Sequence, residues 1–325
     1  MQNQDYKKVI VTGATGFIGK KLIDRLVKLN WNVRGTVRKI SSLSKKNDLE
    51  YFLINDITTI SDWSNILENI DCIIHCAGKS HEMRENNYSD VYQLINTEAT
   101  KKLAEQAAKA GVKRFIFLSS IKVNGEISDK FYNNKKIHSK FKFNDIPDPK
   151  DFYSLSKLEA EKRLWKISSE KGLEVVVLRL PLVYGKGVKG NLMRLVKLIN
   201  YNIPLPFRNI KNERSLIGID NLLDLLIICI NHPNASGKTF LVSDGEDLST
   251  PQLIKFISSA MGRKTFLFPF PLFLLKFLGL IFGKRKVIDR LIESLRIDNT
   301  YTKEILNWTP KVTTEDGIRR MIQEK

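Results

Sequence analysis

Three glycines near the amino end have the spacing of a turn that holds a phosphate group. They are Gly13, Gly16 and Gly19 in the run TGATGFIG, directly after the apolar stretch 9–11. In such a strand-to-helix turn the first glycine permits the tight turn, the second lets the backbone approach a pyrophosphate, and the third allows close packing of helix on strand. The amino end of the following helix stabilises the phosphate charge. The segment therefore predicts a dinucleotide site.

The second apolar stretch, 33–37, ends where a dinucleotide-binding fold reads the adenosine ribose. About 20 residues beyond the glycine turn, an NAD-binding chain carries an Asp or Glu that bonds the ribose hydroxyl and repels a phosphate. Here Val37 stands at that place and Arg38 follows it. Because a guanidinium offers a planar fork to the 2′-phosphate, we expect NADP(H) as the preferred cofactor and NAD(H) as the alternative. Asp56, at the end of the third stretch, is either a contact to the adenine or an ordinary strand-end Asp.

The elements that must position these residues follow from the hydrophobic pattern of the first 180 residues. Short apolar stretches alternate with helical patterns, such as the stripe Ile18, Leu22, Leu26 and Leu29. This alternation predicts parallel βαβ units, hence an α/β, Rossmann-like doubly wound parallel sheet. We expect an NAD(P)-binding domain over residues 1–180 and a smaller substrate-binding lobe over 181–325, with some interleaving of segments. The predicted strands are 9–11, 33–37, 51–54, 72–75, 115–118 and 174–180, and the predicted helices of the lobe are 192–200, 221–231 and 251–261.

Five motifs carry a resemblance to a known family. In chain order they are TGATGFIG, IIHCAG, FLSSIKVNG, YSLSK and LRLPLVYG. They resemble the extended short-chain dehydrogenase/reductases of the NAD(P)-dependent epimerase/dehydratase group, and the likeness covers nearly the whole chain. Within that group the chain is similar to UDP-glucose 4-epimerase-like enzymes of O-antigen synthesis, including the 4-keto-reductase type that makes UDP-N-acetylquinovosamine. The resemblance implies a homodimer that pairs helices 82–110 and 153–171, and further cofactor contacts from Phe17, Ile18, Ile57, Ala77 and Pro181.

The resemblance also implies that a Ser, a Tyr and a Lys carry out proton transfer. Two Tyr-x-x-x-Lys pairs are present. Tyr132 and Lys136 lie in the polar stretch 126–151, which we interpret as a surface loop. Tyr153 and Lys157 open a stretch with an apolar stripe, and a spacing of four residues puts both on one face of a helix. We therefore choose Tyr153 and Lys157.

The chemistry of this pair depends on the ionisation of the phenol. A tyrosine with a pKa of about 10 is a poor base near neutral pH. We expect the ammonium of Lys157 and an oxidised nicotinamide to favour the phenolate of Tyr153. By resemblance, Lys157 also holds the nicotinamide ribose and Ser120 bonds the reacting sugar oxygen. Ser119 stands beside Ser120, and the distance to the motif VNG at 123–125 favours Ser120.

The resemblance points to two substrate contacts besides the proton-transfer set, Arg214 and Asn191. Arg214 matches a family arginine that grips the nucleotide diphosphate, with Asp220 starting a helix six residues later. A bidentate guanidinium suits a phosphate, and a surface arginine is the other interpretation. Asn191 resembles a contact to the nucleotide end, or else caps a helix. The family's second diphosphate arginine has no counterpart in register, and Arg290 is the nearest candidate.

These residues lead to one expected function and two alternatives. We expect an oxidoreductase that acts at carbon 4 of a UDP-linked hexose and reduces a UDP-4-keto-hexose for surface polysaccharide synthesis. The first alternative is an NAD-dependent UDP-hexose 4-epimerase, acting on UDP-glucose or UDP-N-acetylglucosamine. The second is a non-catalytic NAD(P)-sensing protein. The set Ser120, Tyr153 and Lys157 argues against a sensor, since binding alone does not require it.

Composition narrows the choice of partners and compartment. The chain has 53 Lys and Arg against 35 Asp and Glu, a formal net charge of +18. The basic residues are spread along the chain without a basic-aromatic register, so we expect no nucleic-acid partner. Three cysteines exclude a disulfide scaffold, and the start MQNQDYKK lacks the apolar run of a secretory signal. We expect a cytoplasmic protein without a metal, since Cys72, His75 and Cys76 lie on one predicted strand and no second ligand pair is present.

The stretch 266–283, FLFPFPLFLLKFLGLIFG, is the most apolar of the chain and is followed by Lys284, Arg285 and Lys286. Its prolines and its lysine argue against a membrane-spanning helix. We expect a buried helix here. The alternative is an interfacial helix at the inner face of the membrane, with the basic triplet as its anchor, so that residues 266–286 make a peripheral contact.

Overall fold

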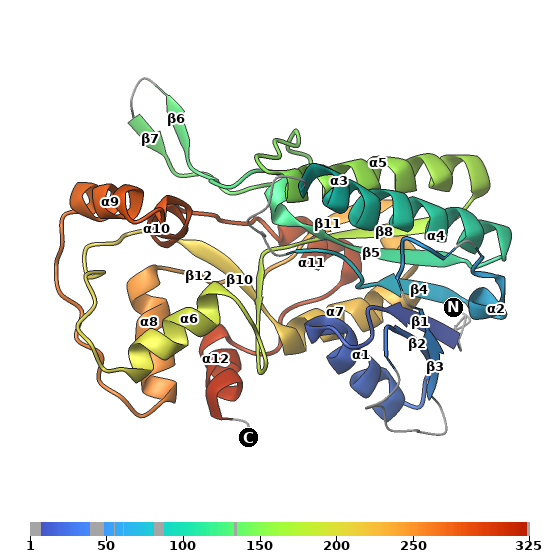
Figure 1. The fold of residues 1–325 in the computed structure, drawn as a ribbon, viewed down its shortest axis with the longest axis horizontal. Helices are drawn as coiled ribbons and strands as arrows, with labels where there is room; N and C mark the ends of the chain where they lie inside the picture. Colours follow the sequence, from blue (N-terminus) through green and yellow to red (C-terminus); the bar gives the residue numbers. More distant parts are fainter. Residues whose placement is uncertain are drawn as a thin grey trace.

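A seven-stranded parallel sheet forms the centre of the larger lobe (Figure 1). The computed structural model describes residues 8–39, 49–54, 56–60, 62–80, 88–132 and 135–323, with the backbone alone at 88, 131–132 and 135–136. The strand order is β11-β8-β5-β4-β1-β2-β3, and every neighbouring pair runs parallel. This is the predicted doubly wound α/β sheet. Its strands are β1 (Lys8–Thr12), β2 (Asn32–Val37), β3 (Leu49–Leu53), β4 (Cys72–His75), β5 (Arg114–Ser120), β8 (Glu174–Leu180) and β11 (Lys238–Leu241).

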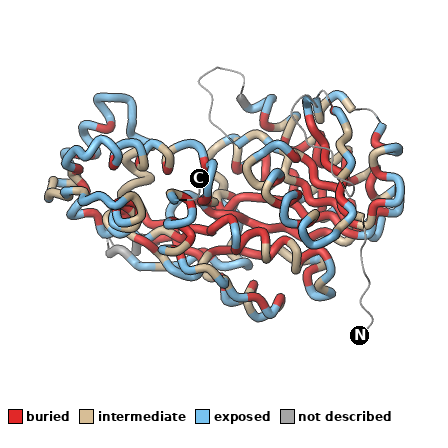
Figure 2. The backbone as a smooth tube through the Cα atoms, turned by 90° about the horizontal axis from the view of Figure 1, so that it is seen from below, coloured by how far each residue is buried: buried red, intermediate tan, exposed pale blue. Residues whose placement is uncertain are grey.

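Helices cover both faces of the sheet, because its strands are apolar on both sides. On β5, Ile116 and Leu118 point to one face and Phe115 and Phe117 to the other, as alternation along a strand requires. One face packs against α1 (Phe17–Lys28) and α7 (Ile219–Asn231), and the other against α4 (Ala99–Lys109) and α5 (Phe152–Lys171). Figure 2 shows the buried backbone concentrated along these strands.

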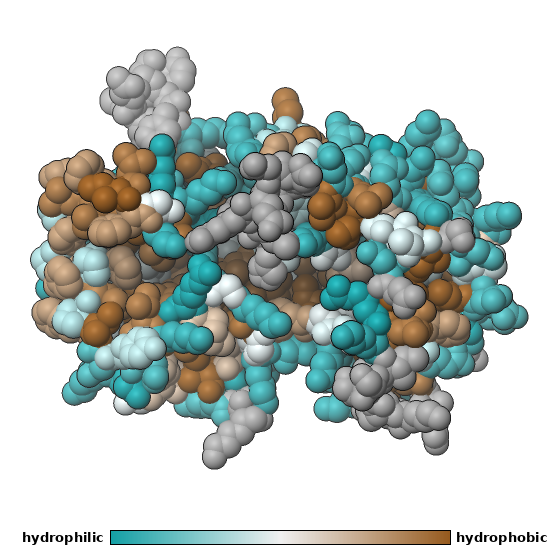
Figure 3. Space-filling model, viewed as in Figure 1, coloured by the Kyte–Doolittle hydropathy of each residue, from teal (hydrophilic) through white to brown (hydrophobic). Residues whose placement is uncertain are grey.

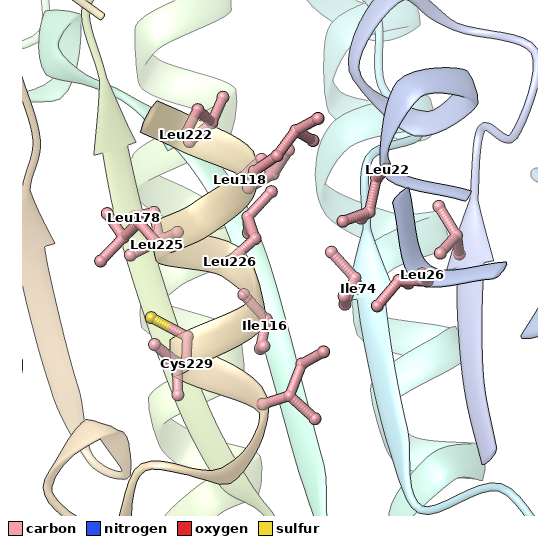
Figure 4. Close-up of a cluster of buried hydrophobic side chains, with 14 of the residues drawn as sticks. Leu22, Leu26, Ile74, Ile116, Leu118, Leu178, Leu222, Leu225, Leu226 and Cys229 are labelled. Atoms are coloured by element: carbon pink, nitrogen blue, oxygen red, sulfur yellow. The ribbon is translucent and has the colours of Figure 1, made fainter. Parts of the chain in front are cut away.

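Segments from beyond residue 180 complete this sheet. β11 pairs with β8 at the edge of the sheet. The helix expected at 221–231 in the smaller lobe is α7, and it packs instead beneath β5 and β8 (Figure 4). Its nearly continuous apolar run, with Leu222, Leu225, Leu226 and Cys229 all buried, is typical of a helix inside a large core.

The smaller lobe is built on a three-stranded sheet at the carboxyl edge of the large one. This sheet has the order β12-β10-β9 and packs with α6, α8 and α12 around an apolar cluster of its own. A two-stranded hairpin, β6–β7, lies within the stretch expected to be a loop. The elements are β9 (Leu182–Tyr184), β10 (Arg214–Gly218), β12 (Asp247–Leu248), α6 (Asn191–Asn200), α8 (Thr250–Ala260), α12 (Thr314–Gln323), β6 (Lys130–Tyr132) and β7 (Lys135–Ile137).

The remaining elements are short. They are α2 (Ser64–Leu67), α3 (Tyr88–Tyr92), a π-helix (Gln93–Glu98) that joins α3 to α4, α9 (Leu272–Ile281), α10 (Arg285–Ile292) and α11 (Thr300–Leu306), with 3₁₀ turns at Ile121–Val123 and Pro233–Ala235.

The apolar stretch 266–283 is not a buried helix. Its helical part, α9, lies at the outer edge of the smaller lobe beside α10 (Figure 1). Within α9, Leu275 and Gly279 are buried and most of the other side chains are exposed. The expectation of burial was wrong because a run that is apolar all round does not reveal which of its faces has a partner. No helix among the described residues is long and apolar enough to cross a membrane.

Candidate active site

The glycine turn between β1 and α1 has the geometry that a dinucleotide requires. Gly13 adopts a φ of +68°, and a Cβ there would lie 2.9 Å from the backbone nitrogen of Ala77. A Cβ on Gly19 would lie 2.3 Å from the carbonyl oxygen of Gly13. Gly16 precedes α1 without a side chain to cap it, and the first turn of α1 contains no acidic residue. The amino end of α1 is therefore suited to an anion, and these residues fit the pyrophosphate of a dinucleotide.

The predicted adenosine contacts lie at the carboxyl ends of β2 and β3. Val37 is buried, and Arg38 is exposed directly after β2. The backbone nitrogen of Ile54 donates to the carbonyl oxygen of Val37 (2.7 Å), which ties the two strand ends together. Asp56 is exposed and accepts from the backbone nitrogen of Thr58 (2.8 Å), so this carboxylate shapes its own turn. Arg38 thus lies where the sequence predicted, and the role of Asp56 as an adenine contact stays a prediction.

Three of the predicted cofactor contacts line the approach to the glycine turn. Phe17 and Ile18 begin α1, and both pack against the core beneath the sheet. Ala77 follows β4, and its backbone nitrogen donates to the hydroxyl of Thr12 (3.2 Å). Further away, Ile57 packs near α2 and Pro181 is buried between β8 and β9. Their contacts with a cofactor stay predictions.

The proton-transfer set predicted from the sequence comes together where β5 meets α5. Asp151 caps α5 by accepting from the backbone nitrogen of Ser154 (2.7 Å), which fixes the first turn that carries Tyr153. The phenol of Tyr153 is hydrogen-bonded to Ser120, the last residue of β5. One turn further along α5, the ammonium of Lys157 donates to the carbonyl oxygen of Leu118 (2.9 Å). The side chains of the alternative pair, Tyr132 and Lys136, lie outside the described residues.

Burial dominates the ionisation of this pair. It raises the pKa of Tyr153 to about 12, and the bond from Ser120 offsets part of that rise. Burial lowers the pKa of Lys157 to about 8, opposed by the nearby carboxylate of Glu161. The expected lowering of the phenol pKa by Lys157 is therefore absent from the protein by itself, because the Lys157 ammonium is turned toward Leu118 and the ring of Phe117 (4.6 Å).

The neighbouring serine is engaged elsewhere. Ser119 donates to Glu161 (2.5 Å) inside the core, and Glu161 forms a buried salt bridge with Arg179 (2.6 Å). Because adjacent residues of a strand face opposite ways, Ser120 is left facing Tyr153. Arg179 also donates to Asn124 (2.9 Å), so one charged network braces β5, β8 and α5 behind the site.

Sequence reasoning missed a second set of polar residues that fixes the site. His75 lies between the hydroxyls of Thr12 (2.8 Å) and Thr100 (3.0 Å), and burial lowers its pKa to about 3. It is therefore neutral near pH 7 and links β1, β4 and α4. Asn96 bonds the backbone of Lys79 (2.8 and 3.1 Å), next to the glycine that lies against Lys157. His75 and Asn96 are single polar residues, and a single residue produces no periodic pattern in the sequence from which its role could be predicted.

On the substrate side, the structure brings together two arginines that are 76 positions apart in the chain. Arg214 begins β10, and burial lowers its pKa to about 10, with the positive charge of Arg290 as the second cause. Arg214 donates to the carbonyl oxygen of Glu293 (3.1 Å). Arg290 lies on α10, near enough for its charge to lower the pKa of Arg214, and its role as a second diphosphate contact stays a prediction.

The other two predicted substrate-side residues lie apart from this pair. Asn191 is the first residue of α6, and Gly190 occupies the capping position before it. Its side chain accepts from Arg194 at 3.5 Å, so the structure does not use Asn191 as the helix cap. Asp220, in the first turn of α7, forms an exposed salt bridge with Arg320 (3.0 Å).

Comparisons with known proteins agree with this arrangement. Residues 9–243 match the NAD dependent epimerase/dehydratase family. A UDP-glucose 4-epimerase of Vibrio cholerae is 40% identical over 98% of this chain and 95% of its own length. A dTDP-4-dehydro-6-deoxyglucose reductase of Escherichia coli is 24% identical over 97% of this chain and 96% of its own length. The UDP-glucuronic acid 4-epimerase of Bacillus cereus, solved in complex with NAD, matches with a TM-score of 0.77 and 20% identity, covering 98% of this chain and 99% of that one, which shows a shared fold.

Proposed function

This chain belongs to the NAD-dependent epimerase/dehydratase family, and we propose that within it the protein is a UDP-hexose 4-epimerase. The observation that carries the proposal is the cluster of Ser120, Tyr153 and Lys157 beside the glycine turn, in a chain 40% identical over almost its whole length to a UDP-glucose 4-epimerase. The sequence favoured reduction of a 4-keto sugar. The comparisons support its alternative, epimerisation, better.

In this proposal Tyr153 exchanges a proton with the 4-hydroxyl of the hexose. Ser120, already hydrogen-bonded to the phenol, holds the same hydroxyl and shares its proton. When bound, the nicotinamide cofactor accepts a hydride from carbon 4 and later returns it. Because burial raises the pKa of Tyr153 to about 12, the phenolate needs a positive charge nearby. In this proposal the ammonium of Lys157, one turn further along α5, turns from the carbonyl oxygen of Leu118 toward the phenol to supply that charge.

The rest of the substrate is held on the side of the smaller lobe. We assign the diphosphate to Arg214 and Arg290, because two neighbouring guanidiniums that repel each other gain most from an anion placed between them. Asn191 is assigned to the nucleotide end. Synthesis of surface polysaccharide, a cytoplasmic location and a homodimer stay predictions.

The deciding experiment uses the cofactor as its readout. An epimerase regenerates its cofactor in every turnover, so the purified protein should carry bound NAD and interconvert UDP-hexose epimers without added cofactor. UDP-glucose and UDP-N-acetylglucosamine are the substrates to test, with product analysis by chromatography. The protein would be a reductase and not an epimerase if it converted neither UDP-glucose nor UDP-N-acetylglucosamine to its 4-epimer and oxidised NADPH when a UDP-4-keto-hexose was added.

The end of β2 favours that reductase as a second candidate function. Val37 provides no carboxylate to select NAD, and Arg38 is exposed where a 2′-phosphate would lie. Charge-assisted hydrogen bonds contribute about 1.5–3 kcal/mol. If Arg38 binds the 2′-phosphate, Arg38→Ala should weaken NADP(H) binding about 10–100-fold and should change NAD(H) binding little. Lys39→Ala, an exposed neighbour, is the matched control. Equal effects of Arg38→Ala on both cofactors would remove the case for NADP(H).

A further inference from the structure

The outer face of α9 exposes several large apolar side chains, whereas a surface helix of a globular protein usually presents polar residues on its outer face. Phe273, Phe277, Leu280 and Ile281 are exposed by 71%, 56%, 60% and 60%. At about 100° per residue these four fall on one side of the helix, opposite Leu275 and Gly279. The space-filling view shows apolar side chains gathered over this end of the molecule (Figure 3).

The inner face of α9 is fixed, so the outer face is presented in a set orientation. Leu275 is buried in the core of the smaller lobe. Gly279 lies so close to α10 that a Cβ there would be 2.7 Å from the side chain of Ile288. Lys276 forms a salt bridge with Glu293 (2.9 Å) behind α10. α9 and α10 therefore form one packed hairpin rather than a loose tail.

The charge around this face is mainly positive, and the carboxylates of Asp289, on α10, and Glu293, directly after it, are paired with Arg285 and Lys276. From residue 248 to residue 288 the chain contains no Asp or Glu but seven Lys and Arg. Lys284, Arg285 and Lys286 follow α9 directly and are exposed. Phe266 and Phe282, at the two ends of the stretch, are exposed by 67% and 71%. An apolar face bordered by cations complements the surface of a phospholipid membrane, where anionic headgroups lie above an apolar acyl layer.

Two other occupants of this face fit the observations less well. A second copy of the chain would bring two such basic borders together, and the carboxylates of Asp289 and Glu293 already pair with Arg285 and Lys276 within the hairpin, which leaves the remaining lysines to repel each other. A membrane-spanning role is excluded for α9 because its 10 residues extend about 15 Å, half of the hydrocarbon thickness.

We propose that α9 lies in the plane of an anionic phospholipid surface, with Phe273, Phe277, Leu280 and Ile281 inserted at the level of the acyl boundary and Lys284, Arg285 and Lys286 against the headgroups. The enzyme is then a peripheral membrane protein that binds through its smaller lobe. The hairpin partner of α9, α10, also carries Arg290.

Vesicle flotation of the full chain tests the proposal, using phosphatidylcholine alone and phosphatidylcholine mixed with phosphatidylglycerol. Binding should require the anionic lipid. Phe273→Ser/Phe277→Ser should reduce the partition coefficient about 10–100-fold, because two aromatic side chains no longer leave water. Lys284→Glu/Lys286→Glu should reduce it about tenfold or more. A Phe277→Trp reporter should shift its emission to the blue on vesicles.

Two control variants distinguish binding through the outer face of α9 from attraction by the overall positive charge of the protein. Ile146→Ser removes an apolar side chain that is 88% exposed elsewhere, and Lys162→Glu/Lys166→Glu makes the same charge change on α5. Both should bind vesicles nearly as the unmodified chain does. Equal losses from the α9 and control variants would overturn the proposal in favour of unspecific attraction. Loss of a dimer in sedimentation velocity for Phe273→Ser/Phe277→Ser, with unchanged flotation, would assign the face to a second copy.

Discussion

The amino end of α5 and the outer face of α9 depart from ordinary burial in opposite directions. At α5, Lys157 is 5% exposed, and a buried ion pair, Glu161 with Arg179, lies behind it. At α9, Phe273 is 71% exposed. Buried charge and exposed aromatic surface both cost free energy in an isolated protein. The stability of the isolated fold therefore does not explain these residues. Substitutions at the amino end of α5 should change turnover and the free energy of unfolding, whereas substitutions on the outer face of α9 should change the free energy of unfolding little.

The largest effect is expected at the phenol of Tyr153. Tyr153→Phe keeps the ring that packs edge-on against Tyr92 and removes the group bonded to Ser120. Turnover should fall by about 10²–10⁴-fold, as for a lost acid-base group, while cofactor binding stays near normal. Steady-state kinetics with a UDP-hexose measure the loss. Tyr132→Phe is the control and should be nearly silent, and equal losses in the two variants would overturn the assignment of Tyr153 as the acid-base group.

The second prediction is a gain in stability at the same site. The pKa of Lys157 is lowered from 10.5 to about 8, which corresponds to about 3 kcal/mol of destabilisation while the group is charged. Lys157→Met should therefore raise the free energy of unfolding at pH 7 by about 1–3 kcal/mol, after the lost bond to Leu118, and abolish turnover.

The pH dependence of this gain gives a sharper test. The unfolded chain holds the proton up to about pH 10.5 and the folded chain up to about pH 8, so the penalty is full below pH 8 and fades as the pH rises toward 10.5. Urea denaturation across this range should show the advantage of Lys157→Met shrinking with pH. Lys166→Met, on the exposed side of α5, should change stability by less than about 0.5 kcal/mol at every pH. An advantage independent of pH would mean that packing, not charge, explains it.

The smallest effect is expected on α9. Phe273→Ser/Phe277→Ser should change the free energy of unfolding in vesicle-free buffer by less than about 0.5 kcal/mol, because neither side chain is buried. Leu275→Ala, on the inner face of the same helix, should cost about 2–4 kcal/mol. Denaturation curves of the three proteins decide. A large loss for the serine variant would show that its aromatic face has a partner within the chain.

How far the sequence predicts this molecule depends on whether the signal is local. The glycine turn and the pair Tyr153–Lys157 are fixed by short-range spacing, and the structure places both at the edge of the sheet as expected. Ser120 was separated from Ser119 by its distance to the motif VNG at 123–125, and the alternation of faces along β5 agrees with that choice. The six strands that the first 180 residues contribute to the large sheet were predicted for the same reason, whereas the hairpin β6–β7 was not.

Features that depend on contacts between distant segments could not be predicted. Arg290 reaches Arg214 through the packing of α10, which no local pattern encodes. β11 is a four-residue strand whose place beside β8 is decided by the sheet edge left open there. The neutral state of His75 depends on its burial in the core, and its ring is held between two threonines, one of them 63 positions earlier.

The return of α7 and β11 to the large sheet has a consequence for synthesis. Translation delivers the chain amino end first, and a nascent chain that stops at residue 180 has Ile116, Leu118 and Leu178 uncovered where α7 will pack. The cofactor turn at Gly13 is made early, yet the sheet behind it closes about 60 residues later, when β11 has left the ribosome. We expect this interval to make the nascent protein a chaperone client. Fragments ending at 180 should bind more of an apolar dye and aggregate more readily than the complete chain at the same concentration.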